Sequence, residues 1–332
     1  TEFPDLDLYH PWDLTIDEAL AISTDCEAAA LAMDPLISNS EGATLNTEAG
    51  VGVYGNSNGF NHGYPISRHS ISCSVIAKEK DEMQRDYWYS TARHSEDLET
   101  AVAVGERAAR RALDRLGARK LQTQQSPVIF KAELAAGLLR SFVSAIRGSA
   151  LYRQATFLLD ALDTQVFPDW VRIEENPHLP RGLASAPFDS EGVATRRRDL
   201  ITDGILKGYV LGSYSARKLG LQTTGNAGGV RNLSIGMGDM NLQQLMREMG
   251  TGLVVTELMG QGVNTITGDY SRGAAGYWVE NGEIAFPVEE ITVAANLRDM
   301  FRNLVVVGND DDYSSSVRTG SWLIESMMIA GE

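Results

Sequence analysis

Four carboxylates that lie close together in the sequence are the best candidates in this chain for metal-dependent chemistry. The four, which fall within fifteen residues of the stretch APFDSEGVATRRRDLITDG, are Asp189, Glu191, Asp199 and Asp203. On a strand, Asp189 and Glu191 would lie on one face and could hold a hard cation. Alternatively they bracket a turn at Gly192 and form weak, exposed ion pairs with the arginines at 196–198, which is the interpretation we favour.

Histidine and cysteine offer no alternative metal site. The five histidines are His10, His62, His69, His94 and His178. No two of them have the i, i+4 spacing of a zinc-binding helix, and the sequence has no CxxC. A metal site built from this chain alone would therefore have to use carboxylates.

The candidate nucleophiles are equally isolated. There is no GxSxG motif, and Ser271 in DYSRG has no histidine near it in sequence, although triads assemble in space. Thr1 could act as an N-terminal nucleophile activated by its own amine, but the acidic, proline-containing residues that follow are not strand-like. Cys26 and Cys73 fall at expected core positions and are interpreted as structural. We assign no catalytic residue.

Two glycine-rich stretches remain, TTGNAGG at 223–229 and TGDYSRGAAG at 267–276. Neither has the spacing of a phosphate-binding loop, and the second enters a hairpin instead of opening a helix. Glycines in strands mark bulges or the close approach of another backbone, as a peptide added along a sheet edge would require. The predicted substrate-cavity residues are Thr224, Gly225, Asn226, Thr267, Asp269, Arg272, Gly273 and Gly276.

The elements that position these residues divide into two parts. In the first, Thr15 and Glu18 form a capping box before a helix whose predicted core face is Ile16, Ala19, Leu20, Ser23, Cys26 and Ala30. The alternation from Ile71 to Ala77 predicts a half-buried strand. A further helix is predicted from an N-cap at Ser95 to a C-cap at Gly117.

The polar stretch ARKLQTQQSP predicts a linker, so we place one domain at 1–120 and another at 121–332. The second domain opens with a long helix at 131–148, after which residues 204–220 and 273–294 read as strands. Asn281-Gly282 predicts a tight hairpin turn. The fold class is therefore α+β, with a helix-plus-sheet first part and a strand-rich second part of antiparallel hairpins.

Composition excludes several classes of function. The 332-residue chain is 43% hydrophobic and 22% charged, which is typical of a soluble globular protein, and it has no apolar run long enough to span a membrane. The net charge is −15, and residues 1–67 hold eleven Asp and Glu with no Lys or Arg. Such a field repels phosphates, which argues against nucleic acid as a partner. The low cysteine content indicates a reducing compartment, the cytoplasm.

Several motifs together resemble one known family. They are GLASAPFDSEGVAT, YSARKLGLQTTGNAGG, TELMGQGVNTITGDYSRGAAGYWVENGEIAFPVEEITVAANL and IESMMIAGE. The chain is similar to the PmbA (TldE) branch of the TldD/PmbA family from LDLYHPWDLT to its last residue. Members of that family are longer at the N-terminus, so we expect this chain to be a fragment or trimmed product.

The resemblance implies a heterodimeric, cytoplasmic metallopeptidase that cleaves unfolded or peptide substrates, including a microcin precursor and an antitoxin. In the TldD branch, an HExxxH helix and a cysteine near the C-terminus hold the metal. The corresponding positions here fall at Arg140, Ser141 and Ala145, and GNDDDYSSSVRTGSWLIE contains no cysteine. The resemblance thus implies that this chain binds no metal or other cofactor and that a sister subunit supplies zinc.

Two alternatives stay open. The chain could be a regulatory scaffold of the gyrase-modulator type, with no share in hydrolysis. It could instead be an independent hydrolase that uses Thr1 or a carboxylate-bound metal.

Overall fold

The computed structural model describes residues 3–311 and 313–332, and the chain forms two compact units. The N-terminal unit consists of Asp5–Ala118 and Pro180–Ser185. The C-terminal unit consists of Arg119–Leu179 and Ala186–Glu332, with Phe3 and Pro4. Both units combine helices with sheets, which confirms the α+β prediction. Thr1, which the sequence offers as a disfavoured candidate nucleophile, lies outside the described residues.

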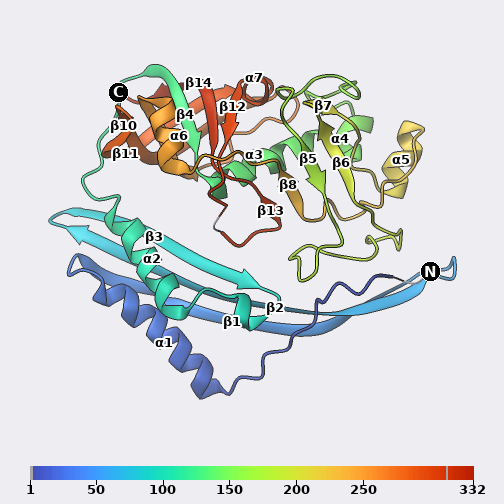
Figure 1. Cartoon of the computed structure of the whole chain (residues 1–332), viewed down its shortest axis with the longest axis horizontal. Helices are drawn as coiled ribbons and strands as arrows, with labels where there is room; N and C mark the ends of the chain where they lie inside the picture. The colour runs from blue at the N-terminus through green and yellow to red at the C-terminus, as the bar shows by residue number, and fades with distance from the viewer. Residues whose placement is uncertain (1–2, 312) are drawn as a thin grey trace. The chain divides into compact units, whose positions relative to one another are not determined.

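The N-terminal unit is built on a three-stranded antiparallel sheet in the order β1-β2-β3, and Figure 1 shows β1 and β2 as a long ribbon. The strands are β1 (Ile37–Gly55), β2 (Asn61–Glu79) and β3 (Glu82–Ala92). Alternate residues of β2 are buried from Ile71 to Ala77, as the sequence predicts. One face of this part of the sheet is therefore a packing surface.

Helices α1 (Ile16–Ala32) and α2 (Ala101–Leu113) pack on each other and against this sheet. The capping box of Thr15 and Glu18 is present, and Cys26 is buried, so both predictions are confirmed. The wider core face is wrong, because Ile16 and Leu20 are 86% and 63% exposed. Helix α1 is buried along a narrower stripe, where Cys26 meets α2 at Gly105.

The predicted start of the second helix is also wrong. Ser95 begins a short 3-10 turn, η1 (Ser95–Asp97), and α2 starts six residues later. Thr100 is its N-cap, since its hydroxyl accepts a hydrogen bond from the amide of Ala103 at 3.2 Å. Both residue types are good caps, and the local pattern did not distinguish them.

The C-terminal unit is organised around a six-stranded sheet in the order β11-β10-β9-β4-β14-β12. Its strands are β4 (Gln124–Phe130), β9 (Gly252–Met259), β10 (Asp269–Glu280), β11 (Glu283–Asn296), β12 (Leu304–Val307) and β14 (Trp322–Ala330). Strand β11 also pairs with β14, which closes the sheet on itself. The β10–β11 turn has Asn281 and Gly282 at φ 52° and 79°, which confirms the predicted hairpin.

A second sheet of short strands has the order β13-β8-β5-β6-β7. These are β5 (Ile173–Glu175), β6 (Arg198–Thr202), β7 (Ile205–Leu206), β8 (Leu233–Ile235) and β13 (Val317–Arg318). The strand prediction for 204–220 is wrong in its second half, because Ser213–Leu219 is helix α5. Gly220 ends this helix in the left-handed conformation, at φ 68°, a conformation that glycine adopts without strain.

The other helices of this unit are α3 (Ala132–Ala145), α4 (Gly148–Tyr152), α6 (Leu242–Met249) and α7 (Leu297–Arg302). The predicted helix at 131–148 corresponds to α3, and only its last residue, Gly148, belongs to α4. Among the described residues, no helix is long and apolar enough to cross a membrane.

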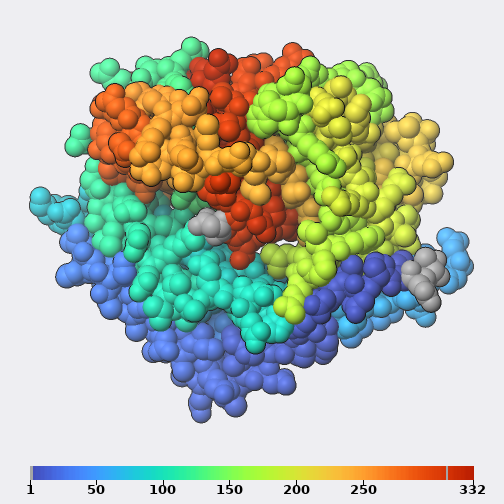
Figure 2. All heavy atoms as spheres, in the orientation of Figure 1, coloured from blue at the N-terminus to red at the C-terminus, as the bar shows by residue number. Residues whose placement is uncertain are grey.

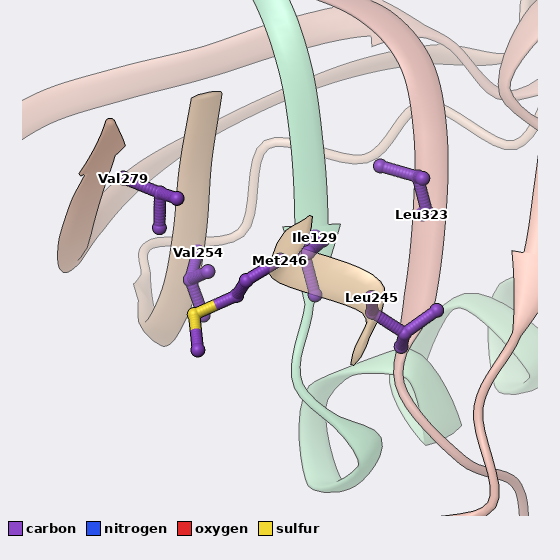
Figure 3. Packing of buried hydrophobic residues seen from close by; sticks show 6 residues of the cluster. All are labelled: Ile129, Leu245, Met246, Val254, Val279 and Leu323. Carbon is purple, nitrogen blue, oxygen red and sulfur yellow. The ribbon is translucent and has the colours of Figure 1, made fainter. Parts of the chain in front are cut away.

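Helix α6 lies on one face of the six-stranded sheet (Figure 1), and its atoms are among those coloured orange in Figure 2. Figure 3 shows Leu245 and Met246 of α6 beside side chains of β4, β9, β10 and β14, with the Met246 sulfur near Val254. A separate buried aromatic cluster joins α3, α7 and β14 through Phe142, Phe167, Phe301 and Trp322. Phe167 and Phe301 stack with their centroids 4.8 Å apart.

Gly105 and Gly137 provide a matched test of this packing, because both lie inside helices. A Cβ atom at Gly105 would overlap the carbonyl oxygen of Cys26, whereas at Gly137 it would meet no atom within 4 Å. We expect Gly105→Ala to lower the free energy of unfolding by about 1–3 kcal/mol. We expect Gly137→Ala to raise it by about 0.5–1 kcal/mol, the gain in helix propensity.

Urea titrations of both variants measure these changes. An unchanged midpoint for Gly105→Ala would contradict the close contact of α1 with α2.

Candidate functional site

Thr224, Gly225 and Asn226 lie in one network, centred on a buried ion pair. The Arg198 Nε atom is 2.9 Å from Glu175 Oε2, and Glu175 is 2% exposed. Asn226 joins both partners, since it donates to Glu175 Oε1 at 2.7 Å and accepts from Arg198 Nη2 at 2.8 Å. The Thr224 hydroxyl is 2.7 Å from the Asn226 side-chain oxygen, and Gly225 has a φ of 72°.

The electrostatics of this network depend on burial. Burial lowers the pKa of Arg198, and the Glu175 carboxylate acts in the opposite direction. A charge in this position is tolerated because its hydrogen bonds are satisfied. Arg198 donates its remaining Nη1 group to the carbonyl of Tyr209 at 2.8 Å. The network therefore ties the turn at 224–226 to β5 and β6.

The four carboxylates at 189–203, which lie close together in the sequence, do not form a cation site in the structure. Asp189 is buried and accepts backbone hydrogen bonds from Glu191, Val193 and Ala227, each at 2.9 Å. Glu191 accepts from the amide of Ser213 at 2.8 Å. Within 3–311 and 313–332, no group of three His, Cys, Asp or Glu side chains could hold a metal ion.

Both interpretations of this stretch need correction. The turn at Gly192 is present, with φ 78°, so Asp189 and Glu191 do not share a strand face. The arginines pair with other carboxylates, Arg197 with Glu174 and Arg198 with Glu175. Sequence proximity did not reveal these partners because they lie on β5, which is 23 residues distant in the chain.

The second predicted group, at 267–276, lies along β10 and the turn before it. The Thr267 hydroxyl donates to Asp269 at 2.6 Å, and Arg272 donates to the carbonyl of Leu258 at 3.3 Å. Tyr270, between them, is buried, and burial raises its pKa to about 12. No hydrogen bond or ion pair of the described residues joins this group to the one at 224–226.

Gly273 and Gly276 do not lie at a free sheet edge. Strand β10 pairs with β11 on one side and with β9 on the other at both glycines. A peptide therefore cannot add to the backbone there, and the edge-addition interpretation is wrong for these two residues. Gly276 is needed at a bulge, because a Cβ atom there would overlap the carbonyl oxygen of Val254.

Ser271 is exposed, and its amide donates to the carbonyl of Gly262 at 2.7 Å. The described contacts place no histidine beside it. His69 is buried in the N-terminal unit, where its ring contacts Thr47 and the carbonyl of His10, each at 2.8 Å. His178 contacts the hydroxyl of Thr195 at 3.1 Å. These contacts are structural, and none forms a nucleophile and base pair at Ser271.

A cavity of about 320 Å³ opens in the C-terminal unit beside α4 and α5. Its lining includes Arg147, Ser149, Tyr152, Glu191, Tyr214 and Asn226. Of the eight predicted cavity residues, only Asn226 belongs to this described lining. The glycine-rich stretch at 223–229 is the only part of this lining that the sequence predicted to border a substrate cavity. The other lining residues were missed because they come from segments that are distant in the chain.

Comparison with known proteins identifies the family. Residues 9–116 match the PmbA/TldA metallopeptidase central domain, and residues 123–331 match the PmbA/TldA metallopeptidase C-terminal domain. The chain belongs to the PmbA/TldD metallopeptidase family. It is 56% identical to Metalloprotease PmbA of Escherichia coli O157:H7 over 329 residues. This alignment covers 99% of this chain and 73% of that protein. This places it in the PmbA branch.

Solved structures agree with this assignment. A proposed modulator of DNA gyrase from Thermotoga maritima is 31% identical, with a TM-score of 0.92 over 99% of this chain and 78% of its own. TldE from Thermococcus kodakarensis has a TM-score of 0.81 over 100% of this chain and 80% of its own. At 20% identity, this last likeness shows the shared fold alone.

The positions that correspond to the TldD-branch metal helix do not fit a zinc ion. They lie on α3, where Arg140 is exposed and donates to the Ser315 hydroxyl at 3.3 Å. Ser141 donates its hydroxyl to the carbonyl of Gly137 at 3.0 Å, and Ala145 is buried. None of these side chains offers the imidazole or carboxylate ligands that zinc requires.

The neighbouring residues Glu174 and Glu175 allow a test of the buried network. Glu175→Gln leaves the buried Arg198 without its counter-charge, so we expect about 3–5 kcal/mol less stability. Glu174→Gln removes the ion pairs with Arg197 and Arg172, whose side chains are 62% and 58% exposed. For this control we expect at most about 1 kcal/mol. Urea unfolding of both variants decides the matter, and equal losses would refute the special role of Glu175.

Gly276 and Gly273 form a second pair. We expect Gly276→Ala to lower the free energy of unfolding by about 1–3 kcal/mol, because its Cβ cannot fit beside β9. At Gly273 the nearest atom to a Cβ is Met259 Cβ at 3.4 Å, an ordinary contact. Gly273→Ala should therefore unfold within about 0.5 kcal/mol of the parent. Thermal and urea unfolding measure both, and a stable Gly276→Ala would contradict the bulge.

Proposed function

We propose that this chain is the non-metal-binding subunit of a cytoplasmic, two-chain metallopeptidase. A sister subunit with an HExxxH helix supplies the zinc and the general base, and the complex cleaves unfolded or peptide substrates. The microcin precursor and the antitoxin implied by the resemblance are substrates of this kind. The observation that carries the proposal is the occupation of the α3 positions by Arg140, Ser141 and Ala145.

The chemistry of these three residues supports this division of labour. A guanidinium at Arg140 repels a cation, and the Ser141 hydroxyl is already bonded to the helix backbone. Ala145 has no donor atom. A zinc-bound water acts as a nucleophile near neutral pH only when three protein ligands leave one position of the metal open. In the proposed complex this constellation belongs to the sister subunit.

A regulatory role remains the second candidate, because a structural relative at 31% identity is described as a proposed gyrase modulator. The relative with 56% identity is named a metalloprotease, which favours the peptidase. Net charge adds to this preference, since a chain of −15 is poorly suited to contact DNA directly.

Reconstitution separates the candidates. We expect neither this chain alone nor a zinc-free sister subunit to cleave an unfolded test peptide, and we expect the zinc-loaded pair to do so. In the pair, Arg140→Ala and Ser141→Ala should keep cleavage within about threefold, or 0.65 kcal/mol, of the parent. Replacing one HExxxH histidine of the sister subunit should abolish it.

Cleavage by this chain alone would overturn the proposal and favour an independent hydrolase. Full cleavage by the zinc-loaded sister subunit without this chain would favour the regulatory role. Copurification of both subunits by size-exclusion chromatography is the control that each variant still assembles.

A further inference from the structure

The cavity beside α4 and α5 has a volume of about 320 Å³, which is room for one amino-acid residue or a group of similar size. Figure 1 shows both helices in the C-terminal unit, and Tyr152 of α4 meets Tyr214 of α5 edge-to-face with centroids 5.8 Å apart. Gly148 permits this contact, because a Cβ atom there would overlap the side chain of Ser215. The two rings form an aromatic side of a cavity whose lining also includes the polar side chains of Arg147, Ser149 and Glu191.

Two arginines approach the same turn at the edge of this cavity. The Arg147 Nη2 atom lies 3.1 Å from the position that a Cβ would take at Gly229. The Arg231 Nη2 atom lies 3.6 Å from the corresponding position at Gly228. Both glycines have positive φ, 95° at Gly228 and 111° at Gly229, so the turn brings bare backbone beside two guanidinium groups.

Neither guanidinium is neutralised within residues 3–311 and 313–332. No carboxylate lies within ion-pair distance of Arg147 or Arg231, and the Arg231 Nε atom is buried without a hydrogen-bond partner. The chain has 44 acidic and only 29 basic side chains, so a shortage of carboxylates does not explain why these arginines lack an acidic partner. Arg147 lines the cavity, so its unpaired guanidinium can take an anionic acceptor supplied from outside.

Glu191 restricts which anionic groups could bind in the cavity. Its Oε2 atom accepts from Ser213, and its carboxylate also lines the cavity. A phosphate group would bring two negative charges next to this carboxylate. The C-terminal residue of a peptide instead carries one carboxylate for an arginine and one N–H for Glu191. Arginine matches a carboxylate well, because its planar group donates two parallel hydrogen bonds.

We propose that this cavity binds the C-terminal residue of a peptide. Arg147 holds the terminal carboxylate, Arg231 adds positive potential beside the glycine turn, and Glu191 accepts the backbone N–H. The side chain of that residue packs against Tyr152 and Tyr214. The choice of a peptide rests on the proposed function, and the site gives this subunit its own part in recognising substrate or product.

Binding to the full 332-residue chain, without the sister subunit or metal, tests this site directly. The probes are two octapeptides of one uncharged sequence, each with an uncharged fluorophore at its N-terminus. One ends in a free carboxylate and the other in a carboxamide, and fluorescence anisotropy gives both affinities. We expect the carboxylate to bind at least about tenfold more tightly.

Variants locate the effect. Arg147 is exposed, and its side chain makes no hydrogen bond to the described residues. Arg147→Ala should therefore fold normally and bind the two peptides equally. Arg217→Ala is the matched control, because it removes the same charge from the exposed surface of α5 outside the cavity. It should keep the preference for the carboxylate. Circular dichroism and the melting temperature verify the fold of each variant.

Equal binding of the acid and the amide by the parent chain would overturn the proposal. So would an equal loss in Arg217→Ala, or displacement of the peptide by inorganic phosphate at the same concentration as a competing unlabelled peptide. Because the assay needs neither zinc nor cleavage, a negative result leaves the two-chain peptidase standing. Failure of reconstituted cleavage would likewise leave a positive binding result intact.

Discussion

The ion pair between Glu175 and Arg198 is the interaction on which the arrangement of the cavity depends. Glu175 is buried and the Arg198 side chain is only 13% exposed, and such a loss of hydration is costly unless the hydrogen bonds are satisfied. Asn226 and the backbone amide of Arg231 both donate hydrogen bonds to Glu175. These bonds fix the turn at 224–231 against the small sheet. This turn carries Gly229, which lies beside Arg147, and Gly228, which lies beside Arg231.

The parts of the fold that the sequence predicted are those with a local cause. The capping box at Thr15, the alternation in β2 and the turn at Asn281 each depend on a few adjacent residues. The exposure of Ile16 and the double pairing of β10 depend on which segments meet in space, and no local pattern contains that information. The sequence predicts a strand at α5 because a helix of seven residues is too short to show a clear helical period.

The same distinction applies to the candidate site. The glycine-rich stretch at 223–229 drew attention to Asn226, which does line the cavity. Arg147 comes from the start of α4 and Glu191 from a loop fixed by Asp189, so their convergence could not be seen before folding. The glycines of β10 stand out in the sequence, but their role is in packing and not in binding. Gly276 makes room for β9, a neighbouring strand of the same sheet.

In the proposed two-chain peptidase, α3 of this chain takes no part in holding the metal. X-ray diffraction from crystals of the reconstituted pair, measured just above and just below the zinc absorption edge, locates zinc without reference to activity. The account predicts an anomalous peak within the HExxxH helix of the sister subunit and none beside Arg140, Ser141 and Ala145. A zinc peak at α3, or one bound by carboxylates of this chain, would contradict it.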